Sequence, residues 1–254
     1  MTRLSAIRDR TPQFGPDDVF EVSLSTNSKT GCSINVAIAQ TCRPTKGCAE
    51  YCYGLLGRLT YDAALASQAR NAAFFASADK AVIRHEARRI ARSVLKRQDF
   101  VRMFGVGDLQ PGSVFFTACI AVEFPELAVW VATRKLELAR QLPLLPNLHV
   151  MLSMDSTTTK KNVEATRWLI QQNGPQFFAA WARRGPADKV PRWVSVVFEE
   201  HKMSRRAQWD PEPRACPATA RDGVDHEGAC EKCRFCFSAE RRAEGPPLVQ
   251  IGKH

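Results

Sequence analysis

The sequence predicts an α/β fold, namely a partial (incomplete) parallel β/α barrel followed by a cysteine-rich, metal-binding C-terminal extension. Two observations lead to this prediction. Between residues 60 and 198, short apolar runs typical of buried strands alternate with longer segments of helical periodicity, which is the order of a parallel sheet. Seven of the nine cysteines fall into two tight groups near the two ends of the chain. Only five or six strands are apparent, fewer than the eight of a complete barrel, so an open sheet also fits.

The first half of the predicted sheet follows from alternation and glycine positions. Residues 19–25 alternate as a strand does and lead into the first cysteine loop. The alanine-rich residues 60–98 predict two helices divided near Asp79, which can cap the second one. Residues 100–107 predict a buried strand that ends in glycines. Residues 112–123 fit either a helix or a strand, and a helix is favoured because it has to connect parallel strands.

The second half repeats this order with shorter units. The expected strands are residues 127–133, 148–153 and 193–198, and the expected helices are residues 135–141, 160–172 and 175–184. Three regions result: an N-terminal surface segment at 1–18, the partial barrel at 19–200, and the cysteine-rich extension at 201–254. The extension contains too few apolar residues for a core of its own, so we expect it to fold by binding metal.

The C-terminal cysteines have the ligand pattern of an iron-sulfur cluster. Cys230, Cys233 and Cys236 recur every third residue, and Cys216 stands upstream before a proline. Bacterial ferredoxins hold a 4Fe-4S cluster with such a C-x2-C-x2-C run and a remote Cys-Pro. Zinc is the alternative, because four thiolates also suit a tetrahedral site, and His226 is a conceivable spare ligand.

The N-terminal cysteines number only three, Cys42, Cys48 and Cys52. A 4Fe-4S cluster held by them would keep one iron free of protein sulfur, where a cofactor or substrate can bind. The alternatives are one composite site with the C-terminal group, or zinc with a fourth ligand other than cysteine. Cys119 lies in an apolar run and is predicted to be core, whereas the sequence leaves the role of Cys32 open.

Polar residues and glycines follow several predicted strands, where the sites of parallel α/β folds form. The candidates for binding a small-molecule cofactor are Gly105, Gly107, Asp108, Lys135, Ser153 and Asp155. Glycine permits close approach of the backbone, and carboxylates accept hydrogen bonds from amines and hydroxyls. The alternative for Asp108 and Asp155 is that they cap turns or helices.

Composition restricts the setting and the partners. The net charge of +10 permits nucleic acid as a partner, but the basic residues of 84–97 accompany an apolar stripe, which favours the solvated face of a packed helix. No apolar run is long enough to cross a membrane, and the N-terminus lacks the apolar core of a signal peptide. We therefore expect a protein of the reducing cytoplasm, where clustered cysteines favour metal over disulfides.

The motifs together resemble two families. The cysteine triad after the first strand, Tyr51 directly before Cys52, and Gly107-Asp108 after a later strand resemble the radical S-adenosylmethionine superfamily. Over roughly residues 20–240, the motifs at 31–35, 42–53, 107–108, 133–135 and 153–155 and the terminal cysteine run are similar to the phage-encoded gene-product-eighty-eight family. A phage origin implies the host cytoplasm.

The superfamily resemblance implies a cofactor and a reaction type. Cys42, Cys48 and Cys52 would hold a cluster whose open iron chelates S-adenosylmethionine, and residues 105–108 would meet its amine. Electron transfer would then cleave the sulfonium, which requires an electron donor. The spacing C-x5-C-x3-C differs from the superfamily's usual C-x3-C-x2-C, so the alternative is an iron-sulfur or zinc protein without this chemistry, acting as a basic module that binds nucleic acid or protein.

Overall fold

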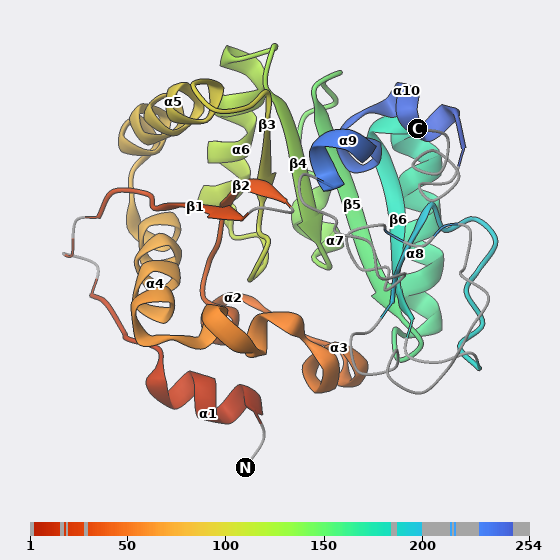
Figure 1. The fold of residues 1–254 in the computed structure, drawn as a ribbon, viewed down its shortest axis with the longest axis horizontal. Coiled ribbons are helices and arrows are strands. Elements are labelled where there is room, and N and C mark those ends of the chain that lie inside the picture. The colour runs from red at the N-terminus through yellow and green to blue at the C-terminus, as the bar shows by residue number, and fades with distance from the viewer. Residues whose placement is uncertain are drawn as a thin grey trace.

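The computed structural model describes residues 3–15, 18, 20–27, 30–183, 187–199, 214, 216 and 229–245. These form a mixed α/β fold around one open, seven-stranded sheet (Figure 1). The strands follow one another across the sheet in chain order, β1 to β7; β1 pairs antiparallel with β2, and every later neighbour pairs in parallel. The predicted α/β class with a mainly parallel sheet is therefore confirmed.

The strands are β1 Leu24–Asn27, β2 Gly31–Ile34, β3 Phe100–Met103, β4 Ala128–Thr133, β5 Leu148–Asp155, β6 Phe177–Arg183 and β7 Val196–Glu199. The α-helices are α1 Arg3–Arg10, α2 Ile38–Thr41, α3 Lys46–Tyr51, α4 Asp62–Ser77, α5 Lys80–Leu95, α6 Pro111–Glu123, α7 Leu136–Ala139, α8 Lys160–Asn173, α9 Ala229–Cys233 and α10 Ala239–Ala243. Short 3-10 turns are η1 Tyr53–Leu55, η2 Gly57–Thr60, η3 Gly174–Gln176 and η5 Phe235–Phe237.

Most predicted helices are confirmed, including the division of residues 60–98. Asp79 caps α5 by accepting hydrogen bonds from the backbone N–H groups of Ala81 and Val82. The apolar stripe of α5 is buried, and Arg84 and Arg88 on its outer side pair with Glu123. The basic helix thus packs with its arginines outward, as expected.

The prediction was wrong at β6 and incomplete at β1 and β2. Residues 177–183 form a strand rather than a helix; alanines and aromatics buried on both faces of a parallel sheet show no alternation, so periodicity does not separate them from a buried helix. The expected strand at 19–25 begins at Leu24 in the described part, and Gly31–Ile34 pairs with it as a further strand. Residues 3–10 of the expected surface segment form α1, with Ile7 buried.

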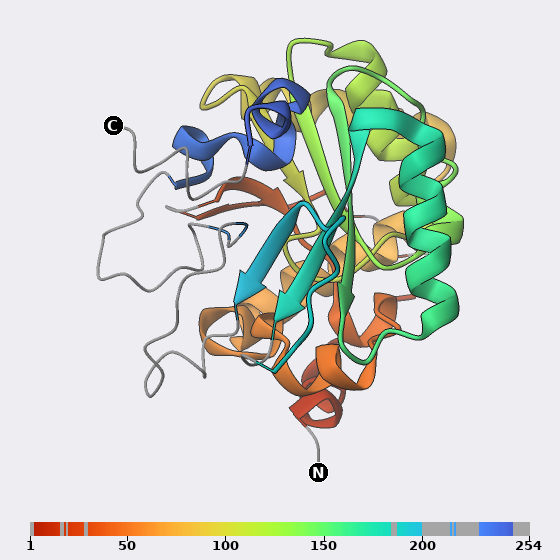
Figure 2. The same ribbon diagram turned by 90° about the vertical axis from the view of Figure 1, so that its right-hand side faces the viewer.

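The two faces of the sheet have different covers. Helices α4, α5, α6 and α8 pack against one face, whose apolar row is Ile34, Met103, Val131 and Val150. The other face, called here the cysteine face, carries the row Ser33, Arg102, Trp130 and His149, whose Cα atoms are partners across β2 to β5. The C-terminal cysteine segment, residues 229–245, lies on this face, opposite α8 (Figure 2).

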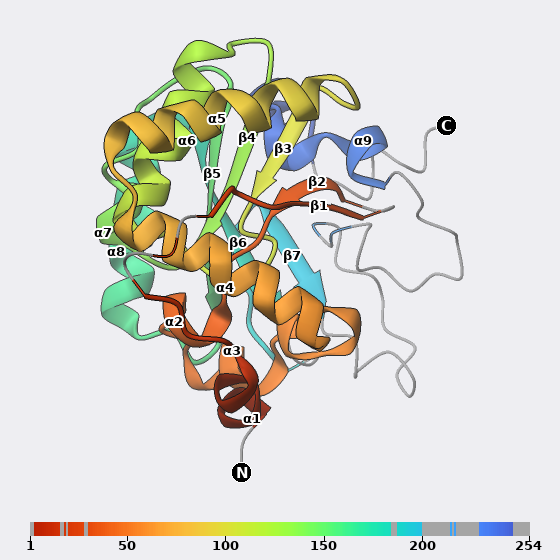
Figure 3. The same ribbon diagram turned by 90° about the vertical axis from the view of Figure 1, so that its left-hand side faces the viewer.

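Aromatic stacking and two arginines attach the C-terminal cysteine segment to the sheet. The rings of Phe237 and Phe100 stack with centroids 4.3 Å apart. Arg234 forms a two-pronged ion pair with Asp99. Arg242 lies over the ring of Phe178, 4.4 Å from its centroid. These contacts hold the segment near the amino ends of β3 and β6, whereas α2 and α3 lie at the opposite, carboxyl ends of the strands (Figures 2 and 3).

Docking of the C-terminal cysteine segment makes stability depend on His149. Burial, followed by the nearby charge of Arg242, lowers the pKa of His149 from 6.5 to about 4. The unfolded chain then binds a proton that the folded chain does not, so stability is complete above pH 6.5 and falls as the pH drops towards 4, by at most about 3 kcal/mol. Urea unfolding across this range should show the loss, and His149→Gln should remove that part of it. Parallel pH profiles for the two proteins would contradict this prediction.

Candidate cysteine centres

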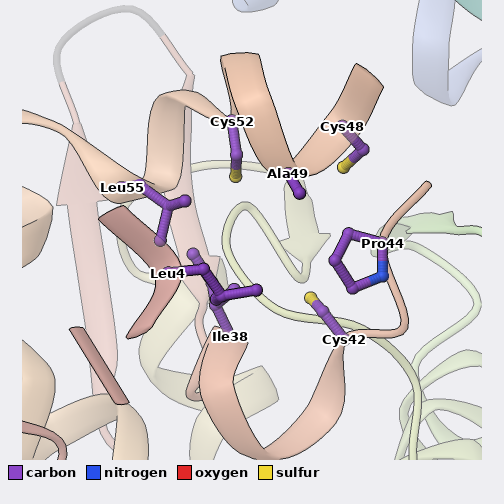
Figure 4. Close-up of a pocket in the computed structure, with 8 residues that line it drawn as sticks. All are labelled: Leu4, Ile38, Cys42, Pro44, Cys48, Ala49, Cys52 and Leu55. Atoms are coloured by element: carbon purple, nitrogen blue, oxygen red, sulfur yellow. The ribbon is translucent and has the colours of Figure 1, made fainter. Parts of the chain in front are cut away.

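The three N-terminal cysteines line one pocket at the carboxyl ends of the strands. Cys42 follows α2, Cys48 lies in α3, and Cys52 follows α3 directly. The rest of the pocket wall is apolar, being formed by Leu4, Ile38, Pro44, Ala49 and Leu55. Figure 4 shows the three sulfur atoms directed towards the space between them. The tertiary structure therefore brings the predicted triad together, and sulfur is its only metal-binding group.

The three thiols differ in acidity. A hydrogen bond from Cys52 lowers the pKa of Cys48 to about 7, with Arg134 adding to the effect and burial opposing it. Donating that hydrogen bond, followed by burial, raises the pKa of Cys52, and burial raises that of Cys42 to about 12. Cys48 is therefore the thiol most readily deprotonated, and the thiolate is the form that binds metal.

Asp155 anchors the loop that carries the triad. Its carboxylate, 1% exposed, accepts hydrogen bonds from Thr45 Oγ1 at 2.5 Å and Thr157 Oγ1 at 2.6 Å. Arg134 Nη2 lies 2.9 Å from the same carboxylate. Thr45 in turn caps α3 by accepting from the Cys48 backbone N–H at 3.1 Å. Burial would raise the pKa of Asp155, but the hydrogen bonds from Thr157 and Thr45 and the charge of Arg134 lower it.

Asp108 and Lys135 fasten the neighbouring strand ends. Asp108 Oδ1 accepts from Thr133 Oγ1 at 2.5 Å and from the Leu109 backbone N–H at 2.8 Å. Its own N–H donates to Thr41, directly before Cys42, at 3.1 Å. Burial raises the pKa of Asp108, against the hydrogen bond from Thr133. Lys135 Nζ donates to the Leu109 carbonyl at 2.6 Å. The bonds of Asp108 and Asp155 thus join strand ends to the cysteine loop, and the bond of Lys135 joins the end of β4 to the segment after β3.

The two predicted glycines lie where backbones come close. Gly107 has φ +87°, and a Cβ there would stand 2.3 Å from the Val36 carbonyl oxygen. A Cβ at Gly105 would stand 2.7 Å from Ser33 Oγ and 2.8 Å from Asn35 Oδ1. Ser153, half-buried, lies two residues after Met151 on β5 and so on the cysteine face. Cofactor binding by Gly105, Gly107, Asp108, Lys135, Ser153 and Asp155 stays a prediction.

The four C-terminal cysteines share one apolar cluster on the cysteine face. Cys216, Cys233 and Cys236 are buried and Cys230 half-buried, packed with Trp130, Phe178 and their neighbours. Burial, followed by the proximity of Cys216, Cys230 and Cys233, raises the pKa of Cys236 well above its ordinary value. Burial raises the pKa of Cys230 to about 11, opposed by the charge of Arg102. Such thiols ionise only if a cation or cluster compensates the charge.

The fit to a metal differs between a single ion and a cluster. Within the described ranges, no group of three or more His, Cys, Asp or Glu side chains is arranged to hold a metal ion. A single Zn²⁺ needs every sulfur about 2.3 Å from one point. A 4Fe-4S cluster places its irons at separate corners, so thiolates around a pocket suit it better. His226, the conceivable spare ligand, lies outside the described residues, whereas Cys119 and Cys32 are buried at 7% and 1% exposure.

Arg102, Trp130 and Tyr53 form a contact group beside the cysteines that the sequence pattern did not single out as a site. Arg102 Nη2 donates to the Tyr53 hydroxyl at 3.0 Å, and its guanidinium carbon lies 4.6 Å from the centroid of the Trp130 ring. Tyr53 follows Cys52, and the charge of Arg102 acts on Cys230 and Cys236. The group thus lies between the two sets of cysteines. An arginine in an otherwise apolar strand was the signal available in the sequence.

Comparison with known proteins gives one family. Its model, described as gene product 88, matches residues 13–239. No curated protein and no solved structure matches the chain. Among the described helices, none is sufficiently long and apolar to span a bilayer.

Proposed function

Because the chain belongs to the gene product 88 family, whose name specifies no reaction, we propose its function from the site itself. We propose an iron-sulfur protein of radical-enzyme type. Cys42, Cys48 and Cys52 would hold one 4Fe-4S cluster, and Cys216, Cys230, Cys233 and Cys236 an auxiliary one. The open sheet would correspond to the partial barrel of such enzymes, with S-adenosylmethionine as the cofactor at the first cluster.

One observation carries this proposal: three thiols from separate turns of one loop face a single apolar pocket at the carboxyl ends of parallel strands. Core packing needs apolar volume and does not require sulfur atoms to converge. Catalytic sites of parallel α/β folds form at this edge of the sheet. Three thiolates also leave a fourth position open, which is what distinguishes catalytic from structural metal sites.

The surrounding residues have defined tasks in this proposal. A cluster in the first pocket would supply an open iron for S-adenosylmethionine and the electron that cleaves it. Leu4, Ile38 and Leu55 exclude water from that side of the sulfur atoms. Arg134 favours the thiolate of Cys48, and Asp155 keeps Arg134 in place through their ion pair. These residues prepare the loop for an anionic ligand set.

Anaerobic purification followed by iron and sulfide analysis tests the proposal. We expect about eight irons per chain in the wild type, from two four-iron clusters. Cys48→Ser and Cys233→Ser should each lose about half of the iron, because each removes a ligand of one cluster. Cys119→Ser is the matched control, since Cys119 is a buried thiol of α6 outside both groups, and it should keep all of the iron.

Electron paramagnetic resonance separates the two parts of the proposal. After reduction, S-adenosylmethionine should change the spectrum of the wild type and of Cys233→Ser but not that of Cys48→Ser. Wild-type protein without acid-labile sulfide, or with zinc in place of iron, would contradict the iron-sulfur assignment. Iron-loaded protein that ignores S-adenosylmethionine would refute only the radical-enzyme part.

A further inference from the structure

Arg102 is a recessed cation without a carboxylate partner in the part of the chain that the structure describes. It lies in the middle of β3, in the row Ser33, Arg102, Trp130 and His149. Its polar contact is with the Tyr53 hydroxyl, and its guanidinium carbon lies 4.6 Å from the centroid of the Trp130 ring, within range of a cation–π interaction. Arg102 is half-buried with its Nε fully covered, and a partly desolvated arginine charge favours a nearby anion.

Hydrogen-bond donors around Arg102 also lack acceptors. Within the described structure, Arg102 Nε and the indole Nε1 of Trp130 are both buried without a partner. Arginine and tryptophan side chains only donate, so neither can satisfy the other. A buried donor left unpaired destabilises the folded state, and native proteins keep few of them. Two such donors on paired residues of β3 and β4 make this part of the cysteine face rich in hydrogen-bond donors beside the Arg102 guanidinium.

The outer edge of the same group is open. Tyr53 is 44% exposed, and because its oxygen accepts from Arg102, its own hydroxyl hydrogen is available to donate. A Cβ at Gly105 would stand 3.7 Å from Arg102 Cζ. Because position 105 is glycine, no side chain from it occupies the space beside the guanidinium. The result is an accessible surface that carries positive charge and donors.

We propose that Arg102 and Tyr53 bind an oxyanion group, carboxylate or phosphate, of the molecule on which the protein acts. Guanidinium nitrogens match the paired oxygens of such groups, and contact with the Trp130 ring restricts the movement of the Arg102 side chain. The bound group would lie between Tyr53, next to the first cysteines, and Cys230 with Cys236 in the second group. The inference rests on the proposed function for the role of this ligand, whereas anion binding itself requires no iron.

Calorimetric titration of the full chain at low ionic strength with inorganic phosphate, and separately with acetate, tests this site. We expect saturable binding of at least one of the two anions. Phosphate should bind more tightly than acetate if the natural ligand carries a phosphate, and acetate more tightly if it carries a carboxylate. Arg102→Met should weaken it at least tenfold, Arg102→Lys should retain part because the charge stays without the fork, and Tyr53→Phe should weaken it about threefold. Arg140→Met is the matched control, because Arg140 also stacks on a tryptophan, Trp168, at 5.3 Å but on the exposed surface.

Three results would overturn the inference: a wild type that binds neither anion, equal affinity in wild type and the Arg102 variants, or an equal loss in Arg140→Met. The first is expected if the cysteine thiolates alone serve as counter-ions of Arg102. If Arg102→Met does not fold, the anion affinities of Arg102→Lys and Tyr53→Phe are compared with that of the wild type instead, because Tyr53 is exposed and its substitution is tolerated more easily. Iron-loaded protein without anion binding refutes this inference alone. Wild-type protein that binds the anion but contains no iron or sulfide after anaerobic purification refutes the proposed function alone.

Discussion

Gly107→Ala is expected to lower the free energy of unfolding by about 3 kcal/mol or more, because a clash with main chain adds to backbone strain. Gly107 combines φ +87° with a Cβ position only 2.3 Å from the Val36 carbonyl oxygen and 2.4 Å from Val36 Cγ2. The obstacle includes main chain, which cannot rotate away as a flexible side chain can. Val36 N–H also bonds to the Val106 carbonyl, so any shift disturbs the strand ends beside the cysteine pocket.

Gly57→Ala is the matched control for this prediction. Gly57 also has a left-handed backbone, φ +59°, but nothing lies within 4 Å of its Cβ position. Alanine there should cost only the backbone strain of about 1–2 kcal/mol. Urea unfolding of both variants measures the difference. Equal losses would show that strain, and not the contact with Val36, makes glycine necessary at position 107.

Asp155→Ala is expected to destabilise the protein by about 3–5 kcal/mol, because it leaves the half-buried Arg134 and two threonine hydroxyls without their acceptor. Arg134 is 18% exposed and Asp155 1% exposed, so water restores little of the lost interaction. The cysteine loop should loosen as well, since Thr45 would lose the carboxylate that holds it against the end of β5. Urea unfolding gives the energy, and the rate of Cys48 alkylation reports on the loop.

Asp99→Ala is the control, because Asp99 pairs with Arg234 at a site where 55% of the Asp99 side chain is exposed. Its loss should be below about 1 kcal/mol. The lowered pKa of Asp155 adds a pH test: its stabilisation should be complete above the unfolded-state value near 3.8 and be lost as the pH falls through the lower folded-state value. Similar losses in Asp155→Ala and Asp99→Ala would contradict the anchoring role of Asp155.

Local pattern was sufficient for much of the fold. Helices α4, α5 and α8 each repeat an apolar stripe over several turns, and Asp79 marks the start of α5 by a local hydrogen bond. Strand β6 failed this test, because its composition is compatible with a helix until the pairing of Val150 to Asp155 with Phe177 to Ala182 decides the matter. The gene product 88 family was predicted correctly, because it was identified from motifs and their spacing along the sequence.

The sequence alone determined which residues are grouped along the chain: two sets of cysteines, glycines and aspartates after strands, and the periodicity of the long helices. Tertiary structure decided which of them meet. Asp108 and Asp155 bond to residues far away in the chain, strand register places Arg102 beside Trp130, and a side-chain hydrogen bond joins Arg102 to Tyr53, none of which a local pattern encodes. The physical reason is that spacing and propensity act over a few residues, whereas burial and unpaired donors exist only once distant segments pack together.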